Sequence, residues 1–118
     1  MWNMVMGASP ASDLAVYQKP TFEAAYRRAL AEGFAQGPAG YARDTVLAMG
    51  RWPFDLAKIT VPVDVWSGEQ DTSHSPDHGT TLAARLPNAR RHVVPGIGGA
   101  VLWTHAAAIL HALLEHCR

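Results

Sequence analysis

The fold is decided by the stretch Val61-Pro62-Val63-Asp64-Val65-Trp66, which ends at Ser67-Gly68. Its β-branched and aromatic residues predict a short strand. A second run of this kind, Ala89-Arg90-Arg91-His92-Val93-Val94, ends at Pro95-Gly96. Between the two runs, Ser75-Pro76 is typical of a helix start, and the apolar face that follows ends before Pro87. Strand, helix and strand in this order predict a crossover that joins two parallel strands.

The first half of the chain is predicted to be helical. Apolar residues recur at three- and four-residue steps from Phe22 to Phe34, which predicts an amphipathic helix. A second helix is predicted from about Tyr41 to Met49, before Gly50. Residues 1–20 show no sustained period and are expected to form a mostly irregular lead-in. A last helix at the C-terminus is expected to bury one apolar face, made of Ala106, Ile109, Leu110, Leu113 and Leu114.

The predicted fold class is therefore α/β, with a helical N-terminal half followed by a strand-helix-strand-helix unit with parallel strands. Polar residues interrupt both strands, since Asp64 lies in the first and Arg90, Arg91 and His92 lie in the second. Strands covered on both faces are usually apolar throughout, so one face of each strand is expected to be exposed to water. Two parallel strands also leave open edges that can pair with another chain.

Length, charge and composition exclude several classes of protein. A chain of 118 residues forms at most one domain of ordinary size. Ten Lys and Arg residues balance ten Asp and Glu residues without a block of like charge, which argues against a nucleic-acid partner. The N-terminus lacks the basic residues of a signal peptide, and no stretch is long enough to cross a membrane. The single Cys117 excludes an internal disulfide framework, so a reducing compartment, the cytoplasm, is expected.

Four segments carry a resemblance by their order and spacing: Trp52-Pro53-Phe54-Asp55-Leu56, Ile59-Thr60-Val61-Pro62-Val63, Trp66-Ser67-Gly68-Glu69-Gln70-Asp71 and Pro95-Gly96-Ile97-Gly98. Together they resemble the C-terminal part of the α/β-hydrolase fold family, in which the second and third segments form the penultimate strand and the turn after it. The resemblance implies one partial hydrolase-like domain over residues 1–118. Residues 1–50 would be its helical cap-side segment and residues 51–118 its C-terminal core segment.

The resemblance implies a role for Asp71, which ends the turn and occupies the position of the acid in a Ser-His-Asp triad. In the family, a Pro-Gly-x-Gly-His turn after the last strand carries the catalytic His, and this sequence has Gly99 in that position. Asp71 is therefore expected to be left to solvent or to turn amides. The Gly-x-Ser-x-Gly nucleophile elbow is also absent, because none of the five serines has the two flanking glycines.

His105 is the imidazole nearest in sequence to the altered turn, six residues after Gly99. It is a weak candidate for a substitute base, because a residue at the start of a helix must still come within hydrogen-bond reach of its partners. The alternative is that Trp103-Thr104-His105-Ala106 is an ordinary helix start. This alternative is favoured by the stiffness of a helix compared with a turn.

The remaining histidines and glycines do not predict a cofactor or metal site. His74 and His78 are four apart, but the helix predicted to begin at Pro76 includes only His78, so a solvated loop is expected there. His111 and His116 are expected on the solvated side of the last helix. The glycines of residues 96–99 lack the spacing and the partner residues of a phosphate-binding loop.

Two functions follow as expectations. The first is a C-terminal hydrolase segment, whose family activity is hydrolysis of an ester or related acyl bond. A small-molecule ester would be its substrate if a missing N-terminal part completed the site, and this chain alone is expected to be inactive. The second is a non-catalytic binding or assembly module that self-associates through its exposed sheet edge. Exposed tryptophans would serve such an interface.

Overall fold

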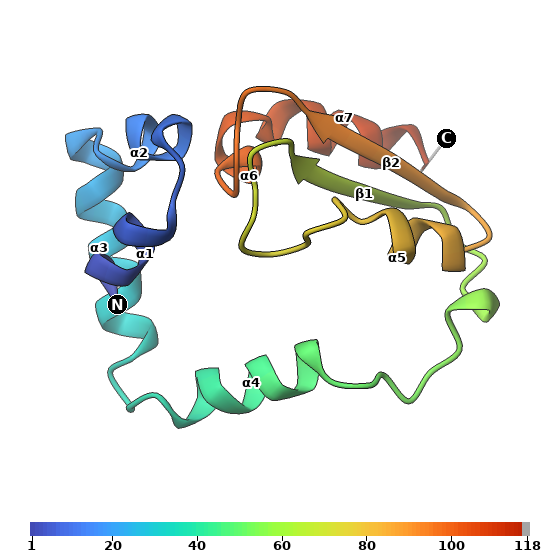
Figure 1. The fold of residues 1–118 in the computed structure, drawn as a ribbon, viewed down its shortest axis with the longest axis horizontal. Coiled ribbons are helices and arrows are strands. Elements are labelled where there is room, and N and C mark those ends of the chain that lie inside the picture. The colour runs from blue at the N-terminus through green and yellow to red at the C-terminus, as the bar shows by residue number, and fades with distance from the viewer. Residues whose placement is uncertain (117–118) are drawn as a thin grey trace.

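The structure is a computed structural model that describes residues 1–116. Cys117, on which the prediction about disulfides rests, lies outside the described residues. Helices dominate the N-terminal half, and the two strands lie in the C-terminal half (Figure 1). The elements are α1 (Trp2–Ala8), α2 (Ala11–Tyr17), α3 (Pro20–Gly33), α4 (Ala39–Met49), the 3-10 turn η1 (Leu56–Lys58), β1 (Val63–Gly68), α5 (Thr80–Arg85), β2 (Ala89–Val94), α6 (Val101–Thr104) and α7 (Ala106–Glu115).

The two strands are parallel, which confirms the prediction made from their sequences. The pairing runs in register from Val63 opposite Ala89 to Gly68 opposite Val94. Helix α5 provides the crossover between them, and α6 and α7 lie along the other side of the strand pair (Figure 1). The described chain is thus a helix-rich α/β structure with one small parallel sheet.

The prediction of an irregular lead-in over residues 1–20 is wrong, because α1 and α2 occupy most of it. Each of these helices has only seven residues, which is too short for a helical period to stand out in the sequence. Aromatic contacts with α3 hold these two helices in place. The ring centroids of Tyr17 and Phe22 are 5.7 Å apart, and those of Trp2 and Tyr26 are 5.8 Å apart. Tertiary packing therefore orders a segment whose sequence pattern is weak.

Helix α5 begins four residues later than predicted, at Thr80 rather than Pro76. His78 and Gly79 both adopt the left-handed backbone region, with φ of 50° and 73°, which a helix beginning at Pro76 could not contain. The Asp77 carboxylate instead accepts the backbone N–H groups of Gly79 and Thr81 at 3.0 and 2.8 Å. These bonds, together with one to the Thr81 side chain, hold the pKa of Asp77 below its usual range. Residues 75–79 are thus a capping turn.

The last helix does not bury the face that was predicted. Ala106, Leu110, Leu113 and Leu114 are exposed, and Ile109 is only partly buried. An apolar helical face becomes buried only where another layer of structure packs on it. Helix α7 contacts β1, and this contact leaves Leu110 and Leu114 more than half exposed.

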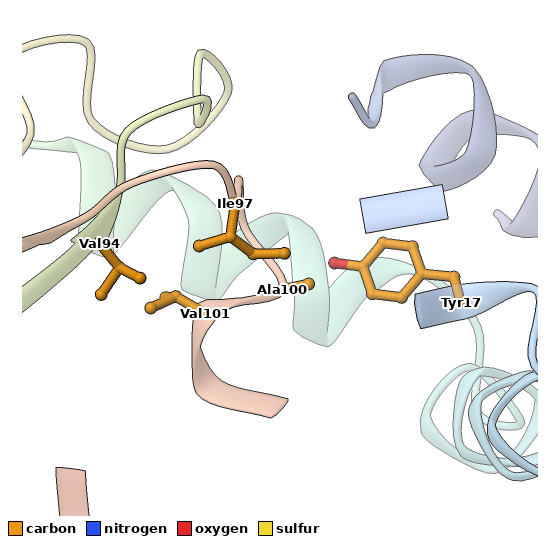
Figure 2. Packing of buried hydrophobic residues seen from close by; sticks show 5 residues of the cluster. All are labelled: Tyr17, Val94, Ile97, Ala100 and Val101. Carbon is orange, nitrogen blue, oxygen red and sulfur yellow. The ribbon is translucent and has the colours of Figure 1, made fainter. Parts of the chain in front are cut away.

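The buried core lies between α2 and the turn that follows β2 (Figure 2). It consists of Tyr17, Val94, Ile97, Ala100 and Val101. The chain as a whole is open: its radius of gyration is 16.0 Å, whereas a compact domain of this length has about 13–14 Å. In Figure 1, α4 runs apart from the sheet and joins the two halves of the molecule. No helix in the described part of the chain is long and apolar enough to cross a membrane.

Candidate functional site

The site is built where the turns after β1 and β2 meet. The backbone N–H of Glu69 donates to the carbonyl of Val94 at 2.8 Å, and the N–H of Gln70 donates to the carbonyl of Ile97 at 2.9 Å. A Cβ on Gly68 would overlap the carbonyl oxygens of Ile97 and Gly98, so glycine is required for this close approach. Two turns that are 27 residues apart in sequence therefore form one backbone unit at the carboxyl end of the sheet.

Helix α2 fixes this unit from the opposite side. The backbone N–H of Gly98 donates to Asp13 Oδ1 at 2.8 Å, and the Asp13 side chain is almost fully buried. The Ser12 hydroxyl donates to Gln70 Oε1 at 2.7 Å, which ties α2 to the first turn as well. Asp13 is a positioning residue that the sequence pattern did not reveal, because nothing local to residues 1–20 indicates a partner 85 residues away.

Asp71 lies at the end of the first turn, and both oxygens of its carboxylate have hydrogen-bond partners. Oδ1 accepts the backbone N–H groups of Ser73 and His74 at 3.0 and 3.1 Å and the Ser73 hydroxyl at 3.0 Å. Oδ2 lies 2.8 Å from Nδ1 of His74. Burial alone would raise the pKa of Asp71, but the hydrogen bonds from Ser73 and His74 outweigh it and lower that pKa below its usual value. Asp71 is thus held as a carboxylate.

Two expectations about this turn hold only in part. Turn amides do bond Oδ1 of Asp71, as expected, but its side chain is only 11% exposed and an imidazole occupies Oδ2. His74 does lie in a loop with its side chain 73% exposed, but its ring is bonded to Asp71 rather than to solvent alone. The tight turn after Asp71 brings residue 74 back to the carboxylate. The sequence signal for this arrangement is an Asp followed by polar residues at the next positions, which favours a turn closed by the Asp side chain.

The His74 ring lies in front of Gly99. A Cβ at position 99 would lie 3.1 Å from Cε1 and 3.4 Å from Nδ1 of His74, and 3.6 Å from Oδ2 of Asp71. The contact with Cε1 is tighter than ordinary van der Waals packing, whereas the distance to Oδ2 is that of an ordinary contact. A side chain at position 99 and the observed His74 ring therefore compete for the same space next to Asp71.

Two cavities flank this position. The first, the site cavity, has a volume of about 310 Å³ and is bordered by Asp71 and by the apolar side chains of Val65, Leu82 and Val101. The second, the helix-side cavity, has a volume of about 370 Å³ and is bordered by α1, α2, α3 and α4. His74 and Gly99 line both cavities. The imidazole therefore stands at the junction of two spaces that can accept small molecules.

His105 lies at the boundary between α6 and α7, as the alternative of an ordinary helix start expected. Its Nδ1 is 2.9 Å from the Thr104 hydroxyl, and it lines neither cavity. Among residues 1–116, the imidazole hydrogen-bonded to Asp71 is that of His74. The structure thus brings Asp71 together with His74 and not with His105.

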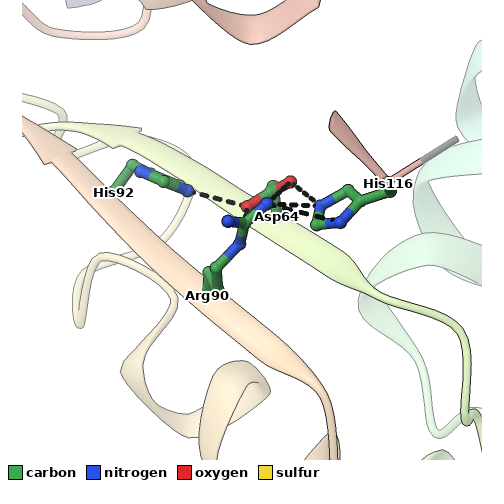
Figure 3. Close-up of polar contacts among 4 residues, drawn as sticks. All are labelled: Asp64, Arg90, His92 and His116. Carbon is green, nitrogen blue, oxygen red and sulfur yellow. Dashed lines mark hydrogen bonds and ion pairs between the residues drawn. The ribbon is translucent and has the colours of Figure 1, made fainter. Parts of the chain in front are cut away.

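A second polar cluster lies on the sheet (Figure 3), and its residues line neither cavity. Asp64 is bonded to Nε2 of His92 at 2.8 Å, to Nε2 of His116 at 2.6 Å and to Nε of Arg90 at 3.1 Å. Burial raises the pKa of Asp64, but the bonds from His92, His116 and Arg90 dominate and lower it to about 2. The prediction of a solvated His116 is therefore wrong, because its ring is bonded to Asp64. The water-exposed face predicted for the strands is seen at Arg90 and Arg91, but Asp64 is largely buried. His111 is exposed on α7, as predicted.

Within residues 1–116, no group of three or more His, Cys, Asp or Glu side chains is arranged to hold a metal ion. His78 was predicted to lie on the helix, and this prediction is wrong: it lies in the capping turn before α5. Comparison with protein-family models, with curated proteins and with solved structures gives no match to this chain. Its function is therefore inferred from the geometry of the Asp71 site.

Proposed function

We propose that this chain is the acid-bearing C-terminal part of a hydrolase of the α/β-hydrolase type, which cleaves an ester or related acyl bond of a small molecule. The observation that carries the proposal is the meeting of the two turns after the parallel strands. Asp71 directs Oδ2 to within 3.6 Å of the Cβ position at residue 99. The resemblance requires the acid turn and the base turn to face each other in this way.

The electrostatics of Asp71 support the same proposal. A triad acid must remain ionised while it orients an imidazole, and it stabilises the imidazolium that forms during the reaction. Three donors to Oδ1 favour the carboxylate and leave Oδ2 for an imidazole N–H. The apolar border of the site cavity offers room for the acyl group of an ester.

The proposal assigns the nucleophile and the oxyanion donors to a segment that these 118 residues do not contain. It also explains the open fold and the exposed apolar face of α7, because a hydrolase sheet would continue with further strands and layers. In this arrangement the chain alone has no esterase turnover.

The proposal is tested on the native polypeptide or assembly that carries this sequence, isolated through a C-terminal tag. A serine-directed fluorophosphonate should label one serine outside residues 1–118, and Asp71→Asn should reduce the labelling rate. Intact-mass measurement of the same preparation identifies the labelled chain. Asp44→Asn, at an exposed position, is the control and should keep the original labelling rate. Absence of labelling, or an equal labelling rate in Asp71→Asn and the unaltered protein, would overturn the proposal.

A second function, a non-catalytic assembly module, is favoured by the large apolar side chains that the described chain exposes. The side chains of Leu110 and Leu114 are 57% and 59% exposed on the same helix. Trp52 and Phe54 stack on each other with centroids 5.3 Å apart and are also exposed. Exposed apolar surface of this kind is usual where another chain docks. Under this proposal, copies of the chain cover these surfaces for each other.

A further inference from the structure

We propose that His74 is the catalytic base of this site and replaces the histidine that the turn after β2 lacks. This inference rests on the proposed function and adds the residue that handles the proton. It places the acid and the base on one turn, three residues apart, rather than on two turns. Four features of the described residues carry it.

The first feature is the fixed orientation of the imidazole. A carboxylate only accepts hydrogen bonds, so the 2.8 Å contact between Asp71 Oδ2 and His74 Nδ1 places the ring proton on Nδ1. The bonds to Oδ1 hold the carboxylate still while it makes this contact. The neutral ring then carries its lone pair on Nε2, which is the tautomer that a general base needs.

The second feature is the availability of Nε2. Within residues 1–116, Nε2 of His74 makes no hydrogen bond, whereas the ring nitrogens of His92 and His116 are engaged by Asp64. His74 lines both the site cavity and the helix-side cavity. A hydroxyl group that enters from either cavity can therefore approach the ring.

The third feature is the glycine at position 99. The ring of His74 occupies the space into which a side chain at that position would extend, with only 3.1 Å between Cε1 and a Cβ there. The imidazole of His74 and an imidazole at position 99 could not both lie next to Asp71, because they would occupy the same space. The absence of a side chain at Gly99 is thus what allows His74 to take this place.

The fourth feature is the position of Ser73. Its hydroxyl is 3.0 Å from Asp71 Oδ1 and 3.2 Å from His74 Nδ1, on the acid side of the ring. A serine that attacks a substrate must give its proton to the opposite nitrogen, Nε2. Ser73 therefore supports the carboxylate, and the attacking hydroxyl comes from the completing segment.

The reaction that follows is balanced in protons and bonds. Nε2 of His74 removes the proton from the attacking hydroxyl as its oxygen bonds to the acyl carbon of the ester. The imidazolium then gives this proton to the leaving alkoxide as the carbon–oxygen bond of the ester breaks. Water repeats the two steps on the acyl intermediate and releases the carboxylic acid. Asp71 stays ionised throughout and stabilises the imidazolium.

The test measures fluorophosphonate labelling of the native assembly with His74→Gln and, as a matched control, His111→Gln on the exposed side of α7. Loss of a general base should slow labelling by about 100-fold or more, while the control keeps the original rate. Equal labelling of the His74→Gln and unaltered assemblies would overturn this inference and leave the proposed function intact. Absence of labelling in the unaltered assembly would instead contradict the proposed function.

A second measurement on the chain itself covers the case in which a variant fails to fold. Phenacyl bromide alkylates an imidazole nitrogen that carries a lone pair, with loss of bromide. Mass spectrometry locates the alkylated histidine, and NMR of the isolated peptide identifies the alkylated nitrogen. We expect His74 to be alkylated on Nε2 in the unaltered chain and on both nitrogens in Asp71→Asn. Alkylation mainly on Nδ1 in the unaltered chain would overturn the assignment of the base.

Discussion

Nδ1 of His74 lies 2.8 Å from Oδ2 of Asp71, and the ring of His74 fills the space next to Gly99. One short turn therefore contains both a buried carboxylate and the imidazole that it orients. Because residue 99 is a glycine, no side chain at that position crowds the His74 ring next to Asp71. The chemistry proposed for the chain depends on this relationship.

Asp71→Asn should destabilise the fold by about 1–3 kcal/mol, because the substitution replaces a charged acceptor of several hydrogen bonds in a largely buried position. Urea denaturation of the two proteins measures the difference. Asp44→Asn on exposed α4 is the matched control and should change stability by less than about 0.5 kcal/mol. Equal stability of all three proteins would mean that the hydrogen bonds to Asp71 contribute nothing in solution.

The Asp64 cluster should make stability depend on acid pH. The pKa of Asp64 is about 2 in the folded chain, whereas an unperturbed Asp has a pKa of about 3.9. Because the folded pKa is the lower one, this contribution is present above about pH 4 and is lost as the pH falls toward about 2. Asp64→Asn should remove it.

The measurement for Asp64 is the difference in unfolding free energy between the unaltered chain and Asp64→Asn as a function of pH. This difference cancels the acid dependence that Asp71 and Asp77 also contribute. It should shrink as the pH falls below about 4. A difference that stays constant down to pH 3 would contradict the cluster.

A double substitution, His74→Ala with Gly99→His, should move the base back to the turn after β2. The introduced imidazole gains the Asp71 carboxylate as a partner, so its pKa should rise above the ordinary value of about 6.5. NMR titration of that ring measures the shift, and adding Asp71→Asn should abolish it. With His74 still present, the two rings compete, and the shift should be smaller. If the pKa of the introduced ring is the same with Asp71 and with Asp71→Asn, the two turns do not face each other.

The exposed face of α7 should drive self-association of the chain when it is prepared alone. Sedimentation velocity should show a sedimentation coefficient that increases with protein concentration. Leu110→Gln together with Leu114→Gln should weaken this association, since both side chains are more than half exposed and are not needed for the core. Ala107→Gln, also exposed on α7, is the matched polar control. A monomer at every concentration would contradict the assembly proposal.

The sequence was sufficient for the elements whose pattern is local. The strands at 63–68 and 89–94, their parallel pairing and the helix of residues 20–33 follow from β-branched runs and from helical spacing. Residues 1–20 were missed because their helices are stabilised by aromatic contacts with α3 rather than by their own period. The exposure of α7 does not follow from its sequence, because its helical period is strong whereas much of its apolar face stays exposed in the structure.

The site could be predicted only in part. The resemblance pointed to Asp71, and the structure adds that its carboxylate is buried and bonded. The spacing of His74 from His78 suggests a metal pair that the helix start excludes, whereas its spacing of three residues from Asp71 is the one that the structure uses. Asp13 and His116 each bond a residue far away in the chain, at Gly98 and Asp64, so no local pattern could have revealed them.

The tautomer of His74 in the neutral chain tests the central claim most directly. A long-range ¹H–¹⁵N correlation spectrum, recorded at a pH where the ring is neutral, distinguishes a proton on Nδ1 from one on Nε2. We predict that the proton is on Nδ1 in the unaltered chain and that it shifts toward Nε2 in Asp71→Asn, with His111 unchanged in both. A proton on Nε2 of His74 in the unaltered chain would contradict the claim that Asp71 orients His74 as a base.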